Sequence, residues 1–162
     1  MNINLGLISS ETFPLPNLQS RLRTASDEIH NLRGFAVLRG LPVAKYSRLE
    51  NIVIYAGVSS HIGSQRARQD HEYEGKPADV ILNHITDLQN TSKASSIGSP
   101  AYTNNSQAFH TDSADVIGLY VLSEAVRGGD STIASSWRVY NELAKERPDL
   151  IRILADDWVV DR

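Results

Sequence analysis

The chain has 162 residues, 41% of them hydrophobic and 22% charged, and a formal net charge of −3, which together are typical of one globular domain that can bury a core. Lys and Arg are scattered along the chain rather than clustered, which argues against nucleic-acid binding. The chain has no Cys, which excludes disulfide scaffolds, zinc–cysteine sites and thiol nucleophiles, so His, Asp, Glu or carbonyl oxygen would hold any metal.

The first part of the chain predicts two helices with a strand between them. Apolar residues recur with helical spacing over residues 18–32, and Gly34 follows where a helix C-cap is expected. Residues 35–39 (FAVLR) then predict a short strand. Ser47 and Glu50 stand in capping-box relation and predict the start of the second helix.

The middle of the chain alternates between apolar and polar segments. Residues 80–85 predict a strand, whereas residues 86–108 are rich in Ser, Thr, Asn, Gly and Pro and are typical of an active-site loop. The apolar run 116–122 lacks alternation, which predicts a strand covered on both faces. Gly128–Asp130 marks a tight turn, and a helix is expected over residues 136–145.

A short helix entered through Pro148 and a strand over residues 158–160 complete the order of elements. The strands are short and joined by turns, so the fold class is α+β or mainly β, as a double-stranded β-helix (jelly roll) with flanking helices. Such a fold normally has eight strands and only about five or six are present. Residues 1–162 therefore form one incomplete domain that lacks C-terminal strands.

His110, Thr111 and Asp112 carry the clearest chemical signal. Residues two positions apart on an extended segment point to the same face, so the imidazole and the carboxylate can converge on one point. With a distant second His they would form the facial triad of non-haem Fe(II) oxygenases. Taken alone, the triplet also fits a strand end whose His and Asp cap a loop.

The surroundings of this triplet resemble a known family. Ala101–Asp112 is followed by an apolar segment and then by a Gly128-Gly-Asp-Ser131 turn. With the earlier segment Arg33–Pro42 and the closing Ser136–Tyr140 helix, this order resembles the taurine dioxygenase (TauD/TfdA-like) family of Fe(II)/2-oxoglutarate-dependent dioxygenases. The resemblance covers about residue 33 to the end and is confined to the family's N-terminal half.

The resemblance implies a ligand set and a reaction. His110 and Asp112 would bind Fe(II), and Ser131, or Thr132 one residue later, would donate a hydrogen bond to 2-oxoglutarate. With O₂, such an enzyme oxidises an unactivated C–H bond of a small-molecule substrate and converts 2-oxoglutarate to succinate. The turn at Gly128 is also explained by a plain hairpin.

Weaker substrate-contacting candidates are polar residues near the triplet or on a strand that could face the pocket: Tyr102, Asn104, Asn105 and Asn83. Asp115 is an alternative carboxylate, but its spacing from His110 is not that of the family. A polar stretch with several basic residues predicts a solvated face: His61, Arg66, Arg68 and His71.

The chain departs from the family in its second half. No His follows His110, whereas the family's distal His ligand and its 2-oxoglutarate-binding Arg normally lie well after the turn. Three Arg residues that follow the turn are expected on helices: Arg138, Arg147 and Arg152. The sources of the third iron ligand and of this Arg therefore stay open.

Three interpretations remain. The chain is part of a longer oxygenase, it associates with a second copy or another chain that completes the fold, or it is a non-catalytic or truncated family member acting as a binding or regulatory subunit. A metal-dependent hydrolase of the cupin type is a further alternative. The first residues do not resemble a signal peptide and no stretch reaches the length of a membrane helix, which predicts a cytoplasmic protein with no membrane partner.

Overall fold

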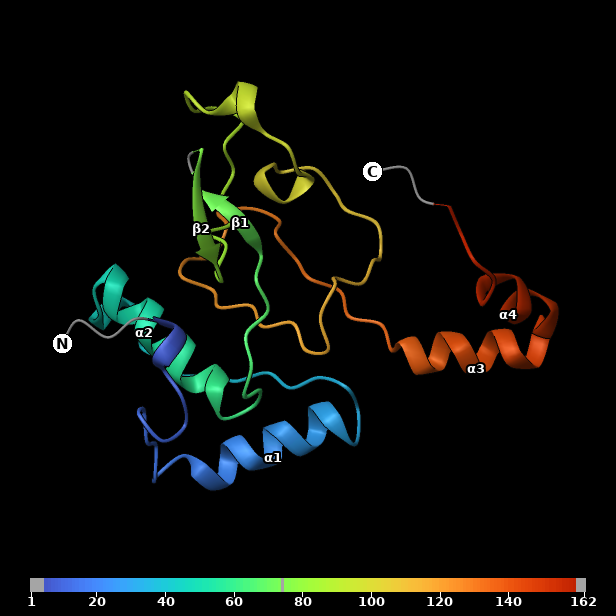
Figure 1. Cartoon of the computed structure of the whole chain (residues 1–162), viewed down its shortest axis with the longest axis horizontal. Coiled ribbons are helices and arrows are strands. Elements are labelled where there is room, and N and C mark those ends of the chain that lie inside the picture. Colours follow the sequence, from blue (N-terminus) through green and yellow to red (C-terminus); the bar gives the residue numbers. More distant parts are fainter. Residues whose placement is uncertain (1–4, 74, 160–162) are drawn as a thin grey trace. The chain divides into compact units, whose positions relative to one another are not determined.

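The structure of the protein is a computed structural model that describes residues 5–73 and 75–159. It divides into two compact units, the first running up to Gly129 and the second beginning at Asp130. The described residues contain four α-helices and one two-stranded antiparallel sheet, with 3-10 turns between them (Figure 1). Helices α1 and α2 and the sheet belong to the first unit, and α3 and α4 to the second.

Helix α1 (Gln19–His30) forms where the apolar spacing predicted a helix. It buries Leu22 and Ala25, while most of its other side chains are exposed. After the helix, Gly34 has a φ of +82° and its N–H donates to the carbonyl oxygen of Glu28 at 2.9 Å. Glycine adopts a positive φ without a steric penalty, which explains why the chain leaves the helix here.

Helix α2 (Arg48–Ser60) begins with the predicted capping box. The Ser47 hydroxyl accepts from the Glu50 N–H at 3.3 Å, and the Glu50 carboxylate accepts from the Ser47 N–H at 2.8 Å. Hydrogen bonds from Ser47, first from its hydroxyl and then from its backbone, lower the pKa of the Glu50 carboxyl. In the first turn, the buried Asn51 amide donates to three carbonyl oxygens at 3.1 Å: those of Val43, Tyr46 and Ser47.

The core of the first unit is small and lies on α1, α2 and the segment before them. Its buried apolar side chains are Ile8, Leu22, Ala25 and Ala56. The predicted solvated face is confirmed at Arg68 and His71, which are exposed. It is wrong at His61 and Arg66, because both of these side chains bind backbone oxygens of distant segments. His61 Nε2 lies 3.0 Å from the carbonyl oxygen of Phe13.

Arg66 connects the N-terminal segment to α2. Its guanidinium donates to the carbonyl oxygens of Leu5 at 3.2 Å, Ile8 at 2.6 Å and Ala56 at 2.9 Å. A planar guanidinium presents several donors in a fixed arrangement, so one side chain can serve three acceptors. Hydropathy patterns do not report such bonds, which is why the stretch was predicted as solvated.

The sheet consists of β1 (Asp70–Tyr73) and β2 (Lys76–Val80), paired with Asp70 opposite Val80 and a bulge between Asp70 and Glu72. The predicted strand over residues 80–85 meets β2 only at Val80, so its boundaries were wrong. Both observed strands are largely exposed and rich in charged residues. They therefore lack the apolar alternation by which a strand is recognised in a sequence.

Two other predicted strands, at residues 35–39 and 116–122, do not form. In the second, Leu119 is 78% exposed and Val121 65% exposed, so it is not a strand covered on both faces. A strand requires a neighbour for its backbone hydrogen bonds, and the part of the chain that the structure describes pairs no strand with either segment. Both segments are apolar, but an apolar composition alone does not supply the neighbouring strand that a sheet requires.

The second unit contains α3 (Ser136–Glu146) and α4 (Pro148–Leu154), both where helices were predicted. The Ser135 hydroxyl caps α3 by accepting from the N–H of Arg138. Beyond α4, residues 158 and 159 are irregular rather than extended in a sheet, and residue 160 of that predicted strand lies outside the described residues. Within residues 5–73 and 75–159, no helix is both long and apolar enough to cross a membrane.

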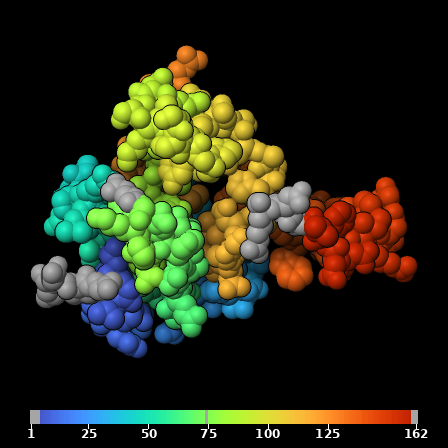
Figure 2. Space-filling view, turned by 45° about the horizontal axis from the view of Figure 1, so that its top comes forward, coloured from blue at the N-terminus to red at the C-terminus, as the bar shows by residue number. Residues whose placement is uncertain are grey.

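The observed mixture of helices with one antiparallel hairpin is an α+β arrangement and does not confirm a jelly roll. The loop of residues 86–108 contains only two 3-10 turns, η3 (Ala94–Ser96) and η4 (Pro100–Tyr102). None of its residues is buried, and part of it forms the yellow-green surface near the top of Figure 2. Its role as an active-site loop remains a prediction.

Candidate metal centre

His110 and Asp112 lie close together on an irregular segment of the first unit. We call them the HTD pair, after the His-Thr-Asp triplet in which they stand. His110 Nε2 is 3.9 Å from Asp112 Oδ1. The two side chains are 56% and 61% exposed, so solvent reaches both. An imidazole nitrogen and a carboxylate oxygen thus approach one another as the spacing predicted, although the segment is not a strand.

A backbone hydrogen bond orients the His110 ring. Its Nδ1 lies 2.8 Å from the carbonyl oxygen of Ala108. Because a carbonyl oxygen can only accept, Nδ1 is the donor, and in the neutral ring Nε2 then carries the free electron pair. Metal-binding histidines commonly use their second nitrogen in this way, which fixes the ring and the tautomer.

The donor set fits two ligands of one divalent cation. Bonds from such an ion to imidazole nitrogen and carboxylate oxygen are each about 2.0–2.2 Å long, so adjacent ligands at a right angle lie about 3 Å apart. His110 Nε2 and Asp112 Oδ1, which are 3.9 Å apart, would therefore have to move about 1 Å closer to bind one ion. In residues 5–73 and 75–159, however, no group of three or more His, Asp or Glu side chains could hold a metal. The HTD pair is therefore an incomplete ligand set.

Three predicted substrate-contacting residues precede the HTD pair. The carbonyl oxygen of the half-buried Tyr102 accepts from the N–H of Leu88 at 2.9 Å. The N–H of Asn104 donates to Oε1 of Gln89 at 3.2 Å, and Asn105, the next residue, is exposed. These bonds join the two ends of the polar loop just before the HTD pair, and they do not assign a role to either Asn side chain.

The remaining predicted site residues lie elsewhere. Asn83 is exposed, and its amide donates to Oε1 of Gln69 at 3.4 Å, beside the sheet. Ser131 and Thr132 are exposed residues of the second unit. The preceding Gly128 and Gly129 have φ of +70° and +78°, the left-handed conformation that glycine tolerates, but no paired strands flank them as in a hairpin.

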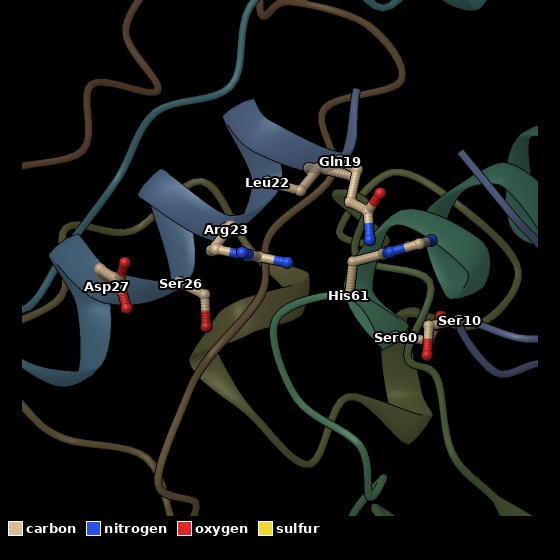
Figure 3. A pocket seen from close by; sticks show the side chains of 8 residues that line it. All are labelled: Ser10, Gln19, Leu22, Arg23, Ser26, Asp27, Ser60 and His61. Atoms are coloured by element: carbon tan, nitrogen blue, oxygen red, sulfur yellow. The ribbon is translucent and has the colours of Figure 1, made fainter. Parts of the chain in front are cut away.

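A shallow cavity of about 260 Å³ lies away from these residues, between α1 and the end of α2 (Figure 3). Its lining is mostly polar and comprises Ser10, Gln19, Leu22, Arg23, Ser26, Asp27, Ser60 and His61. Neither residue of the HTD pair contributes to it. The cavity is therefore not part of the candidate metal centre.

Sequence reasoning missed a contact between α2 and the segment after the HTD pair. The rings of Tyr55 and Tyr120 stack, with centroids 5.5 Å apart and planes 4° apart. Tyr55 donates to the carbonyl oxygen of Gly118 at 2.6 Å, and Tyr120 donates to Oδ1 of Asn51 at 2.9 Å. These four residues form the tyrosine cluster. Helical spacing puts Tyr55 and Asn51 on one face, but no local pattern indicates their partners.

Comparison with known proteins identifies the family. The family model described as "Taurine catabolism dioxygenase TauD, TfdA family" matches residues 3–161. The chain belongs to the TauD/TfdA family. The resemblance inferred from the residues around His110 is thereby confirmed, and the match extends further toward the N-terminus than predicted.

Two curated proteins are similar to this TauD/TfdA chain. The taurine hydroxylase-like protein SAT17 of Stachybotrys chartarum is 39% identical over 158 residues, covering 96% of this chain. FR-33289 synthase of Streptomyces rubellomurinus is 26% identical over 144 residues, covering 89% of this chain. The chain spans 40% of the length of each relative. No solved structure matches it.

Proposed function

We propose that this chain is the iron-binding, N-terminal part of an Fe(II)/2-oxoglutarate-dependent oxygenase. The observation that carries the proposal is the HTD pair itself: a hydrogen-bonded His110 whose Nε2 lies 3.9 Å from an Asp112 carboxylate oxygen. Membership of the TauD/TfdA family supports it. The similarity to a taurine hydroxylase-like protein and to a synthase is compatible with oxidation of a small molecule.

The roles of the chain's residues follow from their chemistry. His110 would provide neutral nitrogen and Asp112 a negative oxygen, a mixed set suited to Fe(II) that leaves positions open for other ligands. Iron, 2-oxoglutarate and O₂ together would provide the oxidising power for attack on an unactivated C–H bond. Ala108 holds the His110 ring, so Nε2 is presented toward the carboxylate and not toward the backbone.

We further propose that the rest of the family's jelly roll completes the site. A third metal ligand and a cation for 2-oxoglutarate would have to join the HTD pair, from further residues of a longer protein or from an associated chain. Ser131 or Thr132 would then provide a hydroxyl for the cosubstrate, and Tyr102, Asn83, Asn104 and Asn105 are the candidates for substrate contact.

Anaerobic titration with Fe(II) and 2-oxoglutarate tests this proposal. Binding of the cosubstrate to protein-held iron is expected to produce a visible charge-transfer absorption. Asp112→Ala should weaken the formation of this complex by more than about 100-fold, because removing a ligand costs more than the 10- to 100-fold typical of groups that only support a ligand.

Asp115→Ala is the matched control, because Asp115 is an exposed carboxylate three positions further along the same segment. It should leave the absorption unchanged. Absence of the signal both from this chain and from the longer protein or complex that completes the site would contradict the proposal, as would an Asp112→Ala variant that keeps it. Loss of signal in the Asp115 variant alone would show that the wrong carboxylate was assigned.

A non-catalytic binding or regulatory role is the second candidate. It is favoured by the lack of a third metal-binding side chain near the exposed HTD pair in the described residues. This candidate predicts that the chain binds a family cosubstrate or a partner without consuming O₂. Measurement of succinate production with Fe(II), 2-oxoglutarate and O₂, in the longer protein or complex that completes the site, separates the two candidates.

A further inference from the structure

The HTD pair lies on an exposed span, residues 105–117, with few connections of its own. Within the described structure, the hydrogen bonds of this span are local: His110 to Ala108, the Ala114 N–H to the Asp112 carbonyl at 3.0 Å, and the N–H of Asn105 to Thr103. Local bonds of this kind do not fix a span relative to the rest of a unit. Its position must depend on what holds its two ends.

Hydrogen bonds to more distant residues lie at both ends of the span. Upstream, the N–H of Asn104 donates to Gln89. Downstream, the tyrosine cluster joins Gly118 and Tyr120 to Tyr55 and Asn51 of α2. The downstream connection is the more extensive, since it combines two hydrogen bonds with a ring stack.

The residue types in the tyrosine cluster allow the segment around Gly118 to lie close to α2. A methyl group at Gly118 would lie 2.8 Å from the Tyr55 hydroxyl oxygen, closer than non-bonded atoms tolerate, so the Tyr55 hydroxyl would have to move away from Gly118. A tyrosine hydroxyl is protonated and able to donate in the neutral range, and burial raises the pKa of Tyr55 further above it. Asn51 is 3% exposed and is itself held by three carbonyl oxygens, so it is a fixed acceptor for Tyr120.

We propose that Tyr55 and Tyr120 are positioning residues, which fasten the end of the HTD span to α2 and so restrict the separation of the two metal-binding side chains. This inference rests on the proposed function. Closing both ends of a flexible span lowers the conformational entropy that metal binding would otherwise have to remove. A ligand pair that is held in place before binding has the higher affinity.

The test compares Tyr55→Phe and Tyr120→Phe with the unmodified chain. Each variant removes one hydroxyl and keeps the ring, so the stack can persist. Tyr73→Phe is the matched control, because Tyr73 is an exposed tyrosine of the same unit, on β1. The affinity for Co(II), added alone, is followed by its visible absorption at a temperature where circular dichroism shows every variant to be folded.

We expect each cluster variant to bind Co(II) about 2- to 10-fold more weakly, the range that corresponds to the net contribution of one hydrogen bond. The Tyr73 control should bind as tightly as the unmodified chain. A purely structural role for the cluster would lower the unfolding midpoint without changing the affinity of the folded protein. That result would overturn the positioning role and leave the proposed function intact.

Lack of Co(II) binding by the unmodified chain would contradict the proposed function, and the positioning role with it. Binding of Co(II) by the unmodified chain therefore tests the proposed function. The ratio of the Co(II) affinities of the variant and the unmodified chain tests the positioning role of the cluster.

A second experiment uses a substitution at Gly118. Gly118→Ala should weaken Co(II) binding, but should add little in a Tyr55→Phe background, because the oxygen that its methyl group would meet is gone. Full additivity would contradict the proposed geometry.

Discussion

The beginning of α2 and the apolar run 116–122 show two different relations between sequence and structure. At the helix start, Ser47 and Glu50 form the capping box that their spacing predicted. The apolar run was predicted as a buried strand, yet Leu119 is 78% exposed and no strand pairs with the run in the described residues. The first signal is complete within four consecutive residues, whereas the second depends on partners elsewhere.

The two regions nevertheless meet in the tyrosine cluster, where Asn51 of α2 accepts a hydrogen bond from Tyr120 of the apolar run. The helix therefore provides a fixed point for a segment that has no regular structure. We therefore expect substitutions at the start of α2 to lower the free energy of unfolding more than substitutions in the apolar run. Three substitutions test this.

The largest effect is expected from Asn51→Ala. It would remove the amide that three carbonyl oxygens and the Tyr120 hydroxyl share as a partner at a part-buried position. The oxygens of Val43 and Ser47 would keep backbone N–H donors, whereas the Tyr46 oxygen and the Tyr120 hydroxyl would lose the partner described here. We expect a loss of about 3 kcal/mol in the free energy of unfolding, measured by chemical denaturation. Asn90→Ala, at an exposed turn, should change it by less than about 0.5 kcal/mol; equal losses in both variants would show that Asn51 has no special role.

A smaller effect is expected from Ser47→Ala, which removes the hydroxyl of the capping box. Loss of a Ser cap costs about 1 kcal/mol, measurable as a lower unfolding midpoint at neutral pH. The exposed Ser64 provides the control substitution to Ala.

This effect should depend on pH. Because Ser47 lowers the pKa of the Glu50 carboxyl in the folded state, the contribution is present above the carboxyl's ordinary pKa. It is lost as the pH falls through the lowered, folded-state pKa. The difference between Ser47→Ala and the unmodified chain should therefore shrink in acid, and a difference that grows in acid would contradict the assigned cause.

The smallest effect is expected from Leu119→Ala, with a change below about 0.5 kcal/mol. The predicted two-sided burial would instead make it about 2–5 kcal/mol, the range that we expect for Leu22→Ala at a position only 4% exposed. Denaturation of both variants under the same conditions decides between these outcomes. A large loss at Leu119 would mean that the run is covered in solution.

Features that depend on neighbouring residues could be predicted from the sequence, whereas features that depend on distant partners could not. All four helices were placed correctly because capping residues, Pro148 and apolar spacing act within a few residues of one another. The HTD pair could be singled out because two positions of separation suffice to bring its side chains together. The exposed strands β1 and β2 lack an apolar signal, and Arg66, Tyr55 and Tyr120 act through partners far away in the sequence.

The contact made by Arg66 has a consequence for how this protein responds to its surroundings. The chain has no Cys, so it cannot join distant segments covalently, and one guanidinium instead links the N-terminal segment to α2 through three backbone oxygens. Unlike a disulfide, this non-covalent cross-link is insensitive to thiol reductants. The junction therefore contains no sulfhydryl group that an oxidant could modify.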